Sequence, residues 1–383
     1  MSAALFLHKN HRFRASVGFA IVAVFSLTTL VACGSDPEKK EPTDTSSGGQ
    51  DAAVTDVGQD AGPQDAGQKL SLKWTEMLPD TPGKMRAVAA VPGQPGSYIV
   101  VGEKATVLRI DGDKVTDISP TSIGKPALNA VWVDKDGSVI VGGSGSTLIT
   151  YDGTSWQVAG AVPPTPPVTF LAIHGVQEGA VWAVGEEGAA FKREGAVWIA
   201  AAVTATDGVG IGADADFVDV RVSAKGAVWI AANKGAKAAG VVLQSDDGKT
   251  WTGTATESAP RALWVDPSDG KQAGGALVVG GTTSAFVHAW DGKGFADAGD
   301  VKWQLGFRCA EGLSTKEVWI GGLKGQLRGW DGAAWSVVKV APPVGTVGGF
   351  PTPSADVLSL AVHASNELMF LTSFKLYRFG EQP

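Results

Sequence analysis

Side chains able to bind a polar or anionic group recur at corresponding positions of a repeated segment. Arginine and histidine donate hydrogen bonds to anionic groups, and tryptophan supplies a large flat apolar surface. When the segments are aligned on an Ala-Val-like pair, this position is occupied by Ala89, Trp132, His174, Arg221, Trp264, Arg308 and His363. Equivalent positions around one axis form a ring, so the last six residues are predicted to bind a polar or anionic ligand. Alternatively, the tryptophans fill packing interfaces while histidine and arginine bond to the backbone.

Motifs for catalysis and for metal binding are absent from the sequence. It contains no His-Glu-x-x-His, no Cys-x-x-Cys and no Gly-x-Ser-x-Gly. Asp214, Asp216 and Asp219 form a loose acidic run that could hold calcium, although such runs are more often solvated loops. We therefore predict no catalytic residue, no metal and no cofactor.

An acidic residue followed by glycine, with a large apolar residue four positions after the acid, repeats through the chain. The copies recur every 40 to 53 residues and begin at Asp111, Asp152, Glu194, Asp247, Asp291 and Asp331. This period is typical of a four-stranded β-propeller blade. Asp-Gly favours a two-residue type I′ hairpin, in which both central residues have positive φ. We place this hairpin between the third and outer strands of each blade.

A second signature predicts seven blades. A large apolar residue with a small residue three positions later occurs at Ile99/Gly102, Val139/Gly142, Trp182/Gly185, Trp229/Ala232, Leu277/Gly280, Trp319/Gly322 and Met369/Thr372. The last unit ends near Gly380 without an outer strand, whereas residues 70–75 resemble an outer strand without a blade. Pairing the two would close the ring through Trp74 and remove an exposed sheet edge. The predicted fold is all-β, a seven-bladed β-propeller over residues 70–383.

Residues 1–32 are typical of a lipoprotein signal peptide. A basic start precedes an apolar stretch from Val17 to Ala32, which is short for a membrane-spanning helix. The segment Leu30-Val31-Ala32-Cys33 resembles the bacterial lipobox, which implies lipidation of Cys33; an ordinary secretory signal is the alternative. In enteric bacteria, aspartate after the lipidated cysteine retains a lipoprotein in the inner membrane. Here Gly34 follows, so the resemblance implies the bacterial outer membrane, on its periplasmic or cell-surface side.

Residues 33–69 are predicted to be the lipid anchor and a disordered acidic linker. Residues 34–68 hold eight acids, two lysines and no aromatic residue, which cannot bury enough apolar surface to fold. Without the signal segment the chain has 29 basic and 39 acidic side chains, a net charge of −10, of which the linker carries −6. The rest lacks a basic stripe, so nucleic acid is excluded as a partner. Cys309 has no disulfide partner once Cys33 is acylated, and we expect it to be a buried apolar residue.

The segment from Gln244 to Trp251 resembles the Asp-box of the bacterial neuraminidase repeat, Ser-x-Asp-x-Gly-x-Thr-Trp. Asp246, Gly248, Thr250 and Trp251 match, and Gln244 stands where the family has serine. Residues 217–251 are also similar to the propeller of the photosystem II stability and assembly factor family. In these families the Asp-box is a structural hairpin on the face away from any active site. The resemblance therefore implies a fold and assigns the motif no chemistry.

Three functions are consistent with the sequence. We expect a membrane-anchored, monomeric, non-enzymatic platform that binds a protein or a glycan. The second possibility is a glycan-active hydrolase or lyase of the Asp-box superfamily, although sialidase chemistry needs a placed tyrosine nucleophile and the chain has only Tyr98, Tyr151 and Tyr377. The third is a lectin that stacks sugars on Trp132, Trp264 and Trp303. Carboxylates with raised pKa at the channel mouth would favour an enzyme, and an apolar face dotted with arginines would favour a binding protein.

Overall fold

The computed structural model describes the propeller and not the segment before it. The described residues are 73–78, 83–158, 167–177, 179–206, 209, 214–233, 240–281, 285–298, 305–338, 356–372 and 375–380. The signal peptide, Cys33, the acidic linker and Trp303 lie outside these ranges, so the predictions made for them stay predictions. Among the described residues, no helix is both long and apolar enough to span a bilayer.

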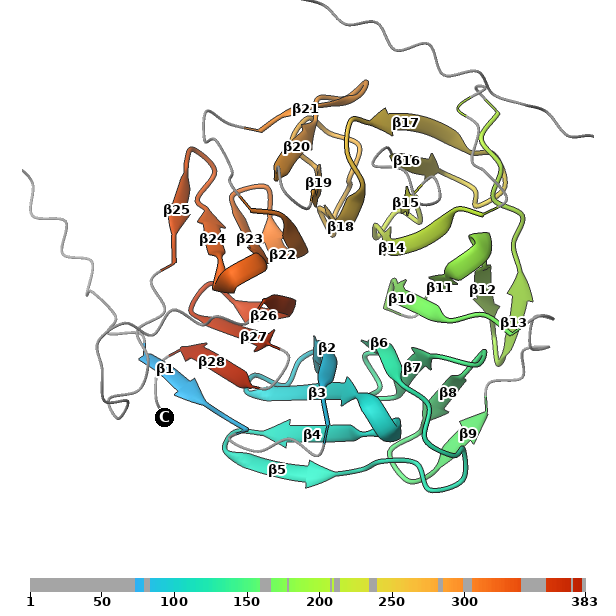
Figure 1. The fold of residues 1–383 in the computed structure, drawn as a ribbon, viewed down its shortest axis with the longest axis vertical. Coiled ribbons are helices and arrows are strands. Elements are labelled where there is room, and N and C mark those ends of the chain that lie inside the picture. The colour runs from blue at the N-terminus through green and yellow to red at the C-terminus, as the bar shows by residue number, and fades with distance from the viewer. Residues whose placement is uncertain are drawn as a thin grey trace, which may run out of the picture. The chain divides into compact units, whose positions relative to one another are not determined.

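Seven four-stranded antiparallel sheets surround a central axis, which confirms the predicted seven-bladed β-propeller (Figure 1). From the axis outward, blades one to four are β2 (Met85–Ala90), β3 (Ser97–Gly102), β4 (Val107–Asp111), β5 (Lys114–Asp117); β6 (Leu128–Val133), β7 (Val139–Gly143), β8 (Leu148–Tyr151), β9 (Trp156–Val158); β10 (Phe170–Gly175), β11 (Val181–Gly185), β12 (Ala190–Glu194), β13 (Val197–Ala200); and β14 (Asp216–Val222), β15 (Val228–Asn233), β16 (Gly240–Ser245), β17 (Thr252–Thr256).

Blades five to seven follow the same order, and three short 3₁₀ turns join second to third strands. The strands are β18 (Pro260–Val265), β19 (Ala276–Gly280), β20 (Phe286–Trp290), β21 (Phe295–Asp297); β22 (Phe307–Ser314), β23 (Glu317–Gly322), β24 (Leu327–Trp330), β25 (Trp335–Val337); and β26 (Val357–Ala364), β27 (Glu367–Thr372), β28 (Leu376–Gly380), β1 (Lys73–Glu76). The turns are η1 (Glu103–Ala105), η2 (Glu186–Gly188) and η3 (Leu323–Gly325).

The N-terminal strand β1 closes the ring, as predicted. It pairs antiparallel with β28, with Trp74 opposite Phe379, and so completes the seventh blade. The Lys375 ammonium adds an ion pair across this seam, with Nζ 2.8 and 2.9 Å from the two carboxylate oxygens of Glu76. Every blade therefore has four strands, although the last one is assembled from both ends of the domain.

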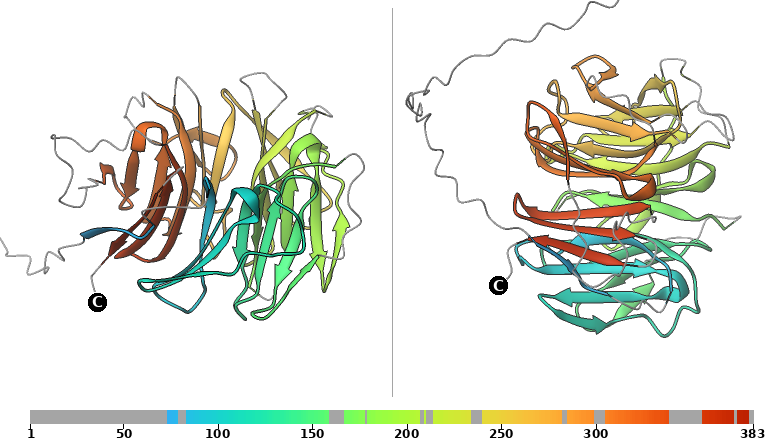
Figure 2. Two further views of the ribbon diagram at one scale, coloured as in Figure 1. Left: turned by 60° about the horizontal axis from the view of Figure 1, so that its bottom comes forward. Right: turned by 60° about the vertical axis from the view of Figure 1, so that its left-hand side comes forward.

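The core lies between adjacent blades rather than within one sheet. Figure 2 shows the blades from the side, packed face to face. The aromatic residue after each Asp-Gly pair contributes to this packing: Trp251 is fully buried and its ring meets that of Trp182 in the preceding blade at 5.8 Å. Trp156 instead donates an indole hydrogen bond to the carbonyl of Ile118 in the preceding blade at 2.6 Å. In blades two and four the repeated aromatic residue thus joins a blade to the one before it.

In five blades a glycine near the end of the second strand closely approaches the backbone, whereas Ala232 and Thr372 hold the equivalent position in blades four and seven. A Cβ on Gly185 would lie 2.1 Å from the carbonyl oxygen of Thr169, the residue before β10. A Cβ on Gly102, Gly280 or Gly322 would lie 2.3 to 2.5 Å from the equivalent carbonyl oxygen. In blade two this glycine is Gly143, one position after the predicted Gly142.

The hairpins between third and outer strands differ from the predicted type I′ turn. In blade two the strands pair up to Tyr151 and Trp156, which leaves a four-residue loop, and only Gly153 has positive φ. The carboxylate of Asp152 accepts the amides of Thr154 and Ser155 at 2.8 and 2.7 Å. The acid therefore shapes the turn through its side chain rather than through a left-handed backbone. In the Asp-box-like segment the same role falls to Asp247 and not to Asp246.

All seven inner strands carry a β-bulge near their first residue, which the sequence analysis missed. The register shifts between Met85 and Ala87 in β2, and at the same place in every other inner strand. A bulge adds one residue that has no partner on the neighbouring strand. The bulge residues are Arg86, Asn129, Leu171, Val218, Arg261, Arg308 and Leu358.

Candidate functional site

The bulges correct the predicted ring at two positions. The residues that share one register on the inner strands are Ala89, Trp132, His174, Arg221, Trp264, Glu311 and Ala361. Arg308 was wrongly placed in this set because it is the bulge residue of β22, three positions before Glu311. His363 lies at a second bulge of β26, two positions after Ala361. Its Nε2 lies 3.0 Å from the carbonyl oxygen of Ser97, in the seam between blades seven and one.

Trp132 and Trp264 pack between blades. Their exposed fractions are 7% and 0%. Trp264 belongs to an apolar cluster with Phe307 and Val318 of the next blade, and Trp132 to one with Phe170 and Ile173 of its next blade. Both rings therefore match the packing alternative, and neither presents a face on which a sugar could stack.

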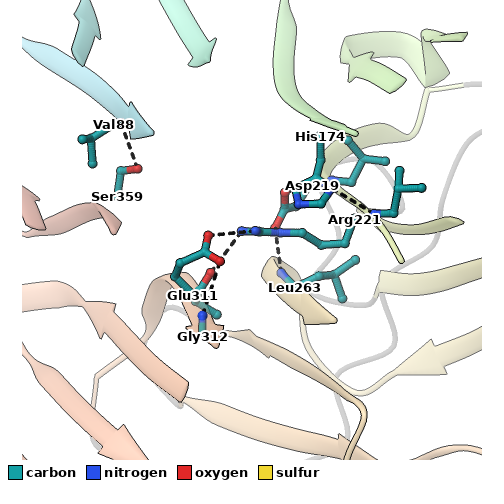
Figure 3. Close-up of polar contacts among 11 residues, drawn as sticks. Val88, His174, Asp219, Arg221, Leu263, Glu311, Gly312 and Ser359 are labelled. Carbon is teal, nitrogen blue, oxygen red and sulfur yellow. Dashed lines mark hydrogen bonds and ion pairs between the residues drawn. The ribbon is translucent and has the colours of Figure 1, made fainter. Parts of the chain in front are cut away.

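Arg221 forms a charged brace across the channel. Its Nη1 donates to Glu311 Oε2 at 2.9 Å, and its Nη2 to the carbonyl of Ala310 at 3.0 Å, so β14 is joined to β22 past the intervening blade (Figure 3). Its Nε lies 3.6 Å from Asp219 Oδ2. Asp219 also accepts the amides of Val220 and Leu263, at 2.8 and 2.7 Å. Arg221 is therefore a largely satisfied structural cation.

Electrostatics in the brace agree with a structural role. Burial raises the pKa of Asp219, although Arg221 and the two amides oppose the shift. Burial, together with the nearby Arg221 charge, lowers the pKa of His174 to about 3, so this imidazole is neutral near pH 7. Its Nδ1 accepts the amide of Val222 at 3.1 Å, which places the ring proton on Nε2. A raised carboxyl pKa was the predicted mark of an enzyme, but here the acid is paired with arginine and bonded to the backbone.

A cavity of about 310 Å³ follows the axis beside this brace. Alanines form much of its wall, among them Ala87, Ala89, Ala130 and Ala361. Three arginines at bulges line the cavity end where the inner strands begin: Arg86, Arg261 and Arg308. We call this end the entrance. Three of the seven bulges thus place an arginine at the same end of the cavity.

The three entrance arginines differ in how well they are neutralised. Arg86 Nη2 lies 3.1 Å from Glu103 Oε1, and Arg308 Nη2 lies 3.8 Å from Asp356 Oδ2. Arg261 has no ion pair with any described residue, and its buried Nε has no hydrogen-bond acceptor. Burial lowers the pKa of Arg261, and the neighbouring Arg308 charge lowers it further. Within the described part of the chain, the entrance therefore holds a partly desolvated positive charge that no acidic side chain pairs with.

The remaining candidate residues are structural. Tyr98 and Glu367 form the tyrosine–glutamate pair that a sialidase would need, with the phenol donating at 2.7 Å. Tyr98 is fully buried, however, and burial followed by Glu367 raises its pKa, which makes it a poorer nucleophile. Burial also raises the pKa of the Cys309 thiol. Asp216 and Asp219 bond to different partners, and the described part of the chain contains no group of three metal-ligating side chains.

Comparison with known proteins yields the fold. No family model matches the chain, and no curated protein matches its sequence. Among solved structures, YCF48 from Cyanidioschyzon merolae is similar with a TM-score of 0.62 at 17% identity, covering 81% of this chain and 100% of its own. YCF48 bound to D1 peptide gives 0.60 at 15%, covering 81% and 96%. A streptogramin B lyase structure gives 0.61 at 10%, covering 81% and 97%. At these identities the likeness extends to architecture alone.

Proposed function

We propose that the protein is a non-enzymatic binding platform that takes a carboxylate-bearing segment of a partner protein at the channel entrance. The observation that carries this proposal is Arg261, a partly buried guanidinium whose Nε has no acceptor among the described residues, beside Arg308 and lining a 310 Å³ cavity. The similarity to a propeller solved with a bound peptide supports a peptide as the ligand. The paired and buried carboxylates of the channel argue against a glycosidase.

A carboxylate suits this entrance for two reasons. Its oxygens accept charge-assisted hydrogen bonds from guanidinium groups, which are about twice as strong as neutral ones. It also offsets the repulsion between Arg261 and Arg308 in a place where water screens them poorly. Because the side chains come from two neighbouring blades, β18 and β22, one acid can contact both.

Replacing Arg261 with glutamine is expected to weaken binding of an acidic peptide at least tenfold. Loss of a hydrogen bond to a charged group costs roughly 1.5–3 kcal/mol, which corresponds to a tenfold or larger rise in Kd. The measurement is titration calorimetry with the peptide acetyl-Asp-Gly-Gly-amide. The matched control is Arg86→Gln, which removes the same charge from the same rim, but at a residue already paired with Glu103.

The control is expected to change Kd less than threefold. Equal losses in the two variants would show that only overall charge matters. Equal affinity for acetyl-Asn-Gly-Gly-amide would show that no carboxylate is recognised, and either result would overturn the proposed function.

We further propose that the platform is held at the outer membrane by lipid on Cys33, followed by a flexible acidic tether. The lipobox-like Leu30-Val31-Ala32-Cys33 and the acidic composition of residues 34–68 support this proposal. We expect mass spectrometry of the membrane fraction to find an N-terminal peptide that starts at acylated Cys33. Recovery of an unmodified mature form from the soluble fraction would contradict it.

A further inference from the structure

The inner strands leave one edge unpaired, and that edge faces the channel. Backbone amides on such an edge need acceptors from outside the sheet. In blade one the amide of Val88 donates to the hydroxyl of Ser359 in blade seven, at 3.2 Å (Figure 3). In blade five the amide of Leu263 donates to Asp219 of blade four, at 2.7 Å. A polar residue of the preceding blade thus satisfies the edge amide of the next.

The same register in other blades offers no such acceptor. Ser359 and Asp219 occupy the position just after the bulge, and its equivalents in blades one and two are Ala87 and Ala130. The amides that these alanines face belong to Val131 and Ile173, which share the register of Val88 and Leu263. No described side chain accepts from Val131 or Ile173.

Both amides border the axial cavity. Val131 and Ile173 line it together with Ala87 and Ala130, whose small side chains leave space in front of them. An amide without any acceptor is costly, and a polar cavity of this size admits water that can bond to it. A ligand carbonyl that replaces this water reproduces its hydrogen bond. One wall of the cavity therefore presents two backbone amides, those of Val131 and Ile173, that can donate to a ligand.

The charges of the Arg221 brace favour a neutral acceptor beside the amides of Val131 and Ile173. The brace holds two acidic side chains, Asp219 and Glu311, against the single cation Arg221. An anionic group of a ligand placed here would be repelled by this excess of acids. An anionic group at the entrance would instead be attracted by Arg261 and Arg308. The arrangement therefore suits one acidic residue at the entrance, followed by uncharged backbone.

We propose that a peptide held at the entrance continues into the cavity, where its backbone carbonyls accept hydrogen bonds from the amides of Val131 and Ile173. This inference rests on the proposed function and specifies its ligand as an acidic residue followed by small, uncharged residues. Alanine at positions 87 and 130 then determines specificity, because it leaves both donors available.

Serine substitutions test this proposal, because Ser359 shows how a hydroxyl at this register occupies the facing amide. The double variant Ala87→Ser, Ala130→Ser should occupy the amides of Val131 and Ile173. The matched control is Ala172→Ser at the equivalent position of blade three, since the amide that it faces, that of Val220, already donates to Asp219. Thermal unfolding should find all variants folded.

Two probes separate the entrance from the cavity. Acetyl-Asp-amide reaches only the entrance, whereas acetyl-Asp-Gly-Gly-amide also offers backbone carbonyls to the cavity. We expect the double variant to weaken the longer probe about fivefold or more, from the loss of two neutral hydrogen bonds. The short probe should be unchanged, and Ala172→Ser should alter neither. Hydrogen exchange of the Val131 and Ile173 amides should slow when the longer probe binds and not when the short one does.

The outcomes distinguish this inference from the function on which it rests. If the ratio of the two affinities is the same in wild type and double variant, the peptide does not enter the cavity, while recognition at the entrance stands. If neither probe binds the wild-type protein, both proposals are overturned.

Discussion

Removal of residues 70–78 is expected to abolish the stable fold and cause aggregation. The deletion takes away β1, whose four residues pair with β28, and exposes the edge of the last blade. It also removes Met77 and Leu78, which are 8% and 6% exposed in the core, and the partner of Lys375. Two buried side chains of this size stabilise a fold by roughly 2–5 kcal/mol each, which together approach the whole stability of a typical domain. Circular dichroism and size-exclusion chromatography measure the loss.

Deletion of residues 34–68 is the matched control. This segment is longer, 35 residues against nine, precedes β1 and holds no aromatic residue. Its removal should leave the melting temperature within about a degree of the full chain, because surface changes rarely matter by more than about 0.5 kcal/mol. Equal melting temperatures for the two truncations would contradict closure by β1.

Replacement of Arg221 with alanine should destabilise the protein by about 3–5 kcal/mol. The arginine is 15% exposed, and its loss leaves Asp219 and Glu311 without a cation inside the channel. It also leaves the carbonyl of Ala310 without its donor. For a domain of this size such a loss lowers the melting temperature by roughly 6 °C or more. Thermal unfolding of the purified variant gives the value.

Two companion variants fix the interpretation of that result. Arg86→Ala breaks an exposed pair with Glu103 and should cost no more than about 1 kcal/mol. Combining Arg221→Met with Glu311→Gln removes both charges of the 2.9 Å pair and should recover part of the loss. If Arg221→Ala kept the wild-type melting temperature, Arg221 would be a solvated ligand-binding group, as the sequence first indicated.

The architecture could be predicted because it repeats. The acid-Gly pairs mark six blades, and a second-strand glycine in close contact with a carbonyl oxygen marks five. Closure by β1 followed from counting strands, because the last unit lacked one. The turn type was wrong because the carboxylate of Asp152 shapes the loop, a role that backbone preference alone does not reveal.

The site was harder to predict because it depends on register. The bulge adds one residue to each inner strand. An alignment by apolar pattern therefore gave Arg308 the register position of Arg221, whereas it shares the bulge position of Arg261. The sequence did contain a signal: an arginine follows the first strand residue at Met85, Pro260 and Phe307. The pairing of Arg221 with Glu311 could not be foreseen, since the two lie 90 residues and two blades apart.

A crystal structure of the protein with acetyl-Asp-Gly-Gly-amide is the most direct measurement of where the platform binds. We predict the aspartate carboxylate within hydrogen-bond distance of the Arg261 and Arg308 guanidinium groups at the entrance, with the glycine carbonyls inside the axial cavity. A peptide bound instead along an outer strand such as β13, or on the hairpin face at Asp247, would contradict a binding site at the channel entrance.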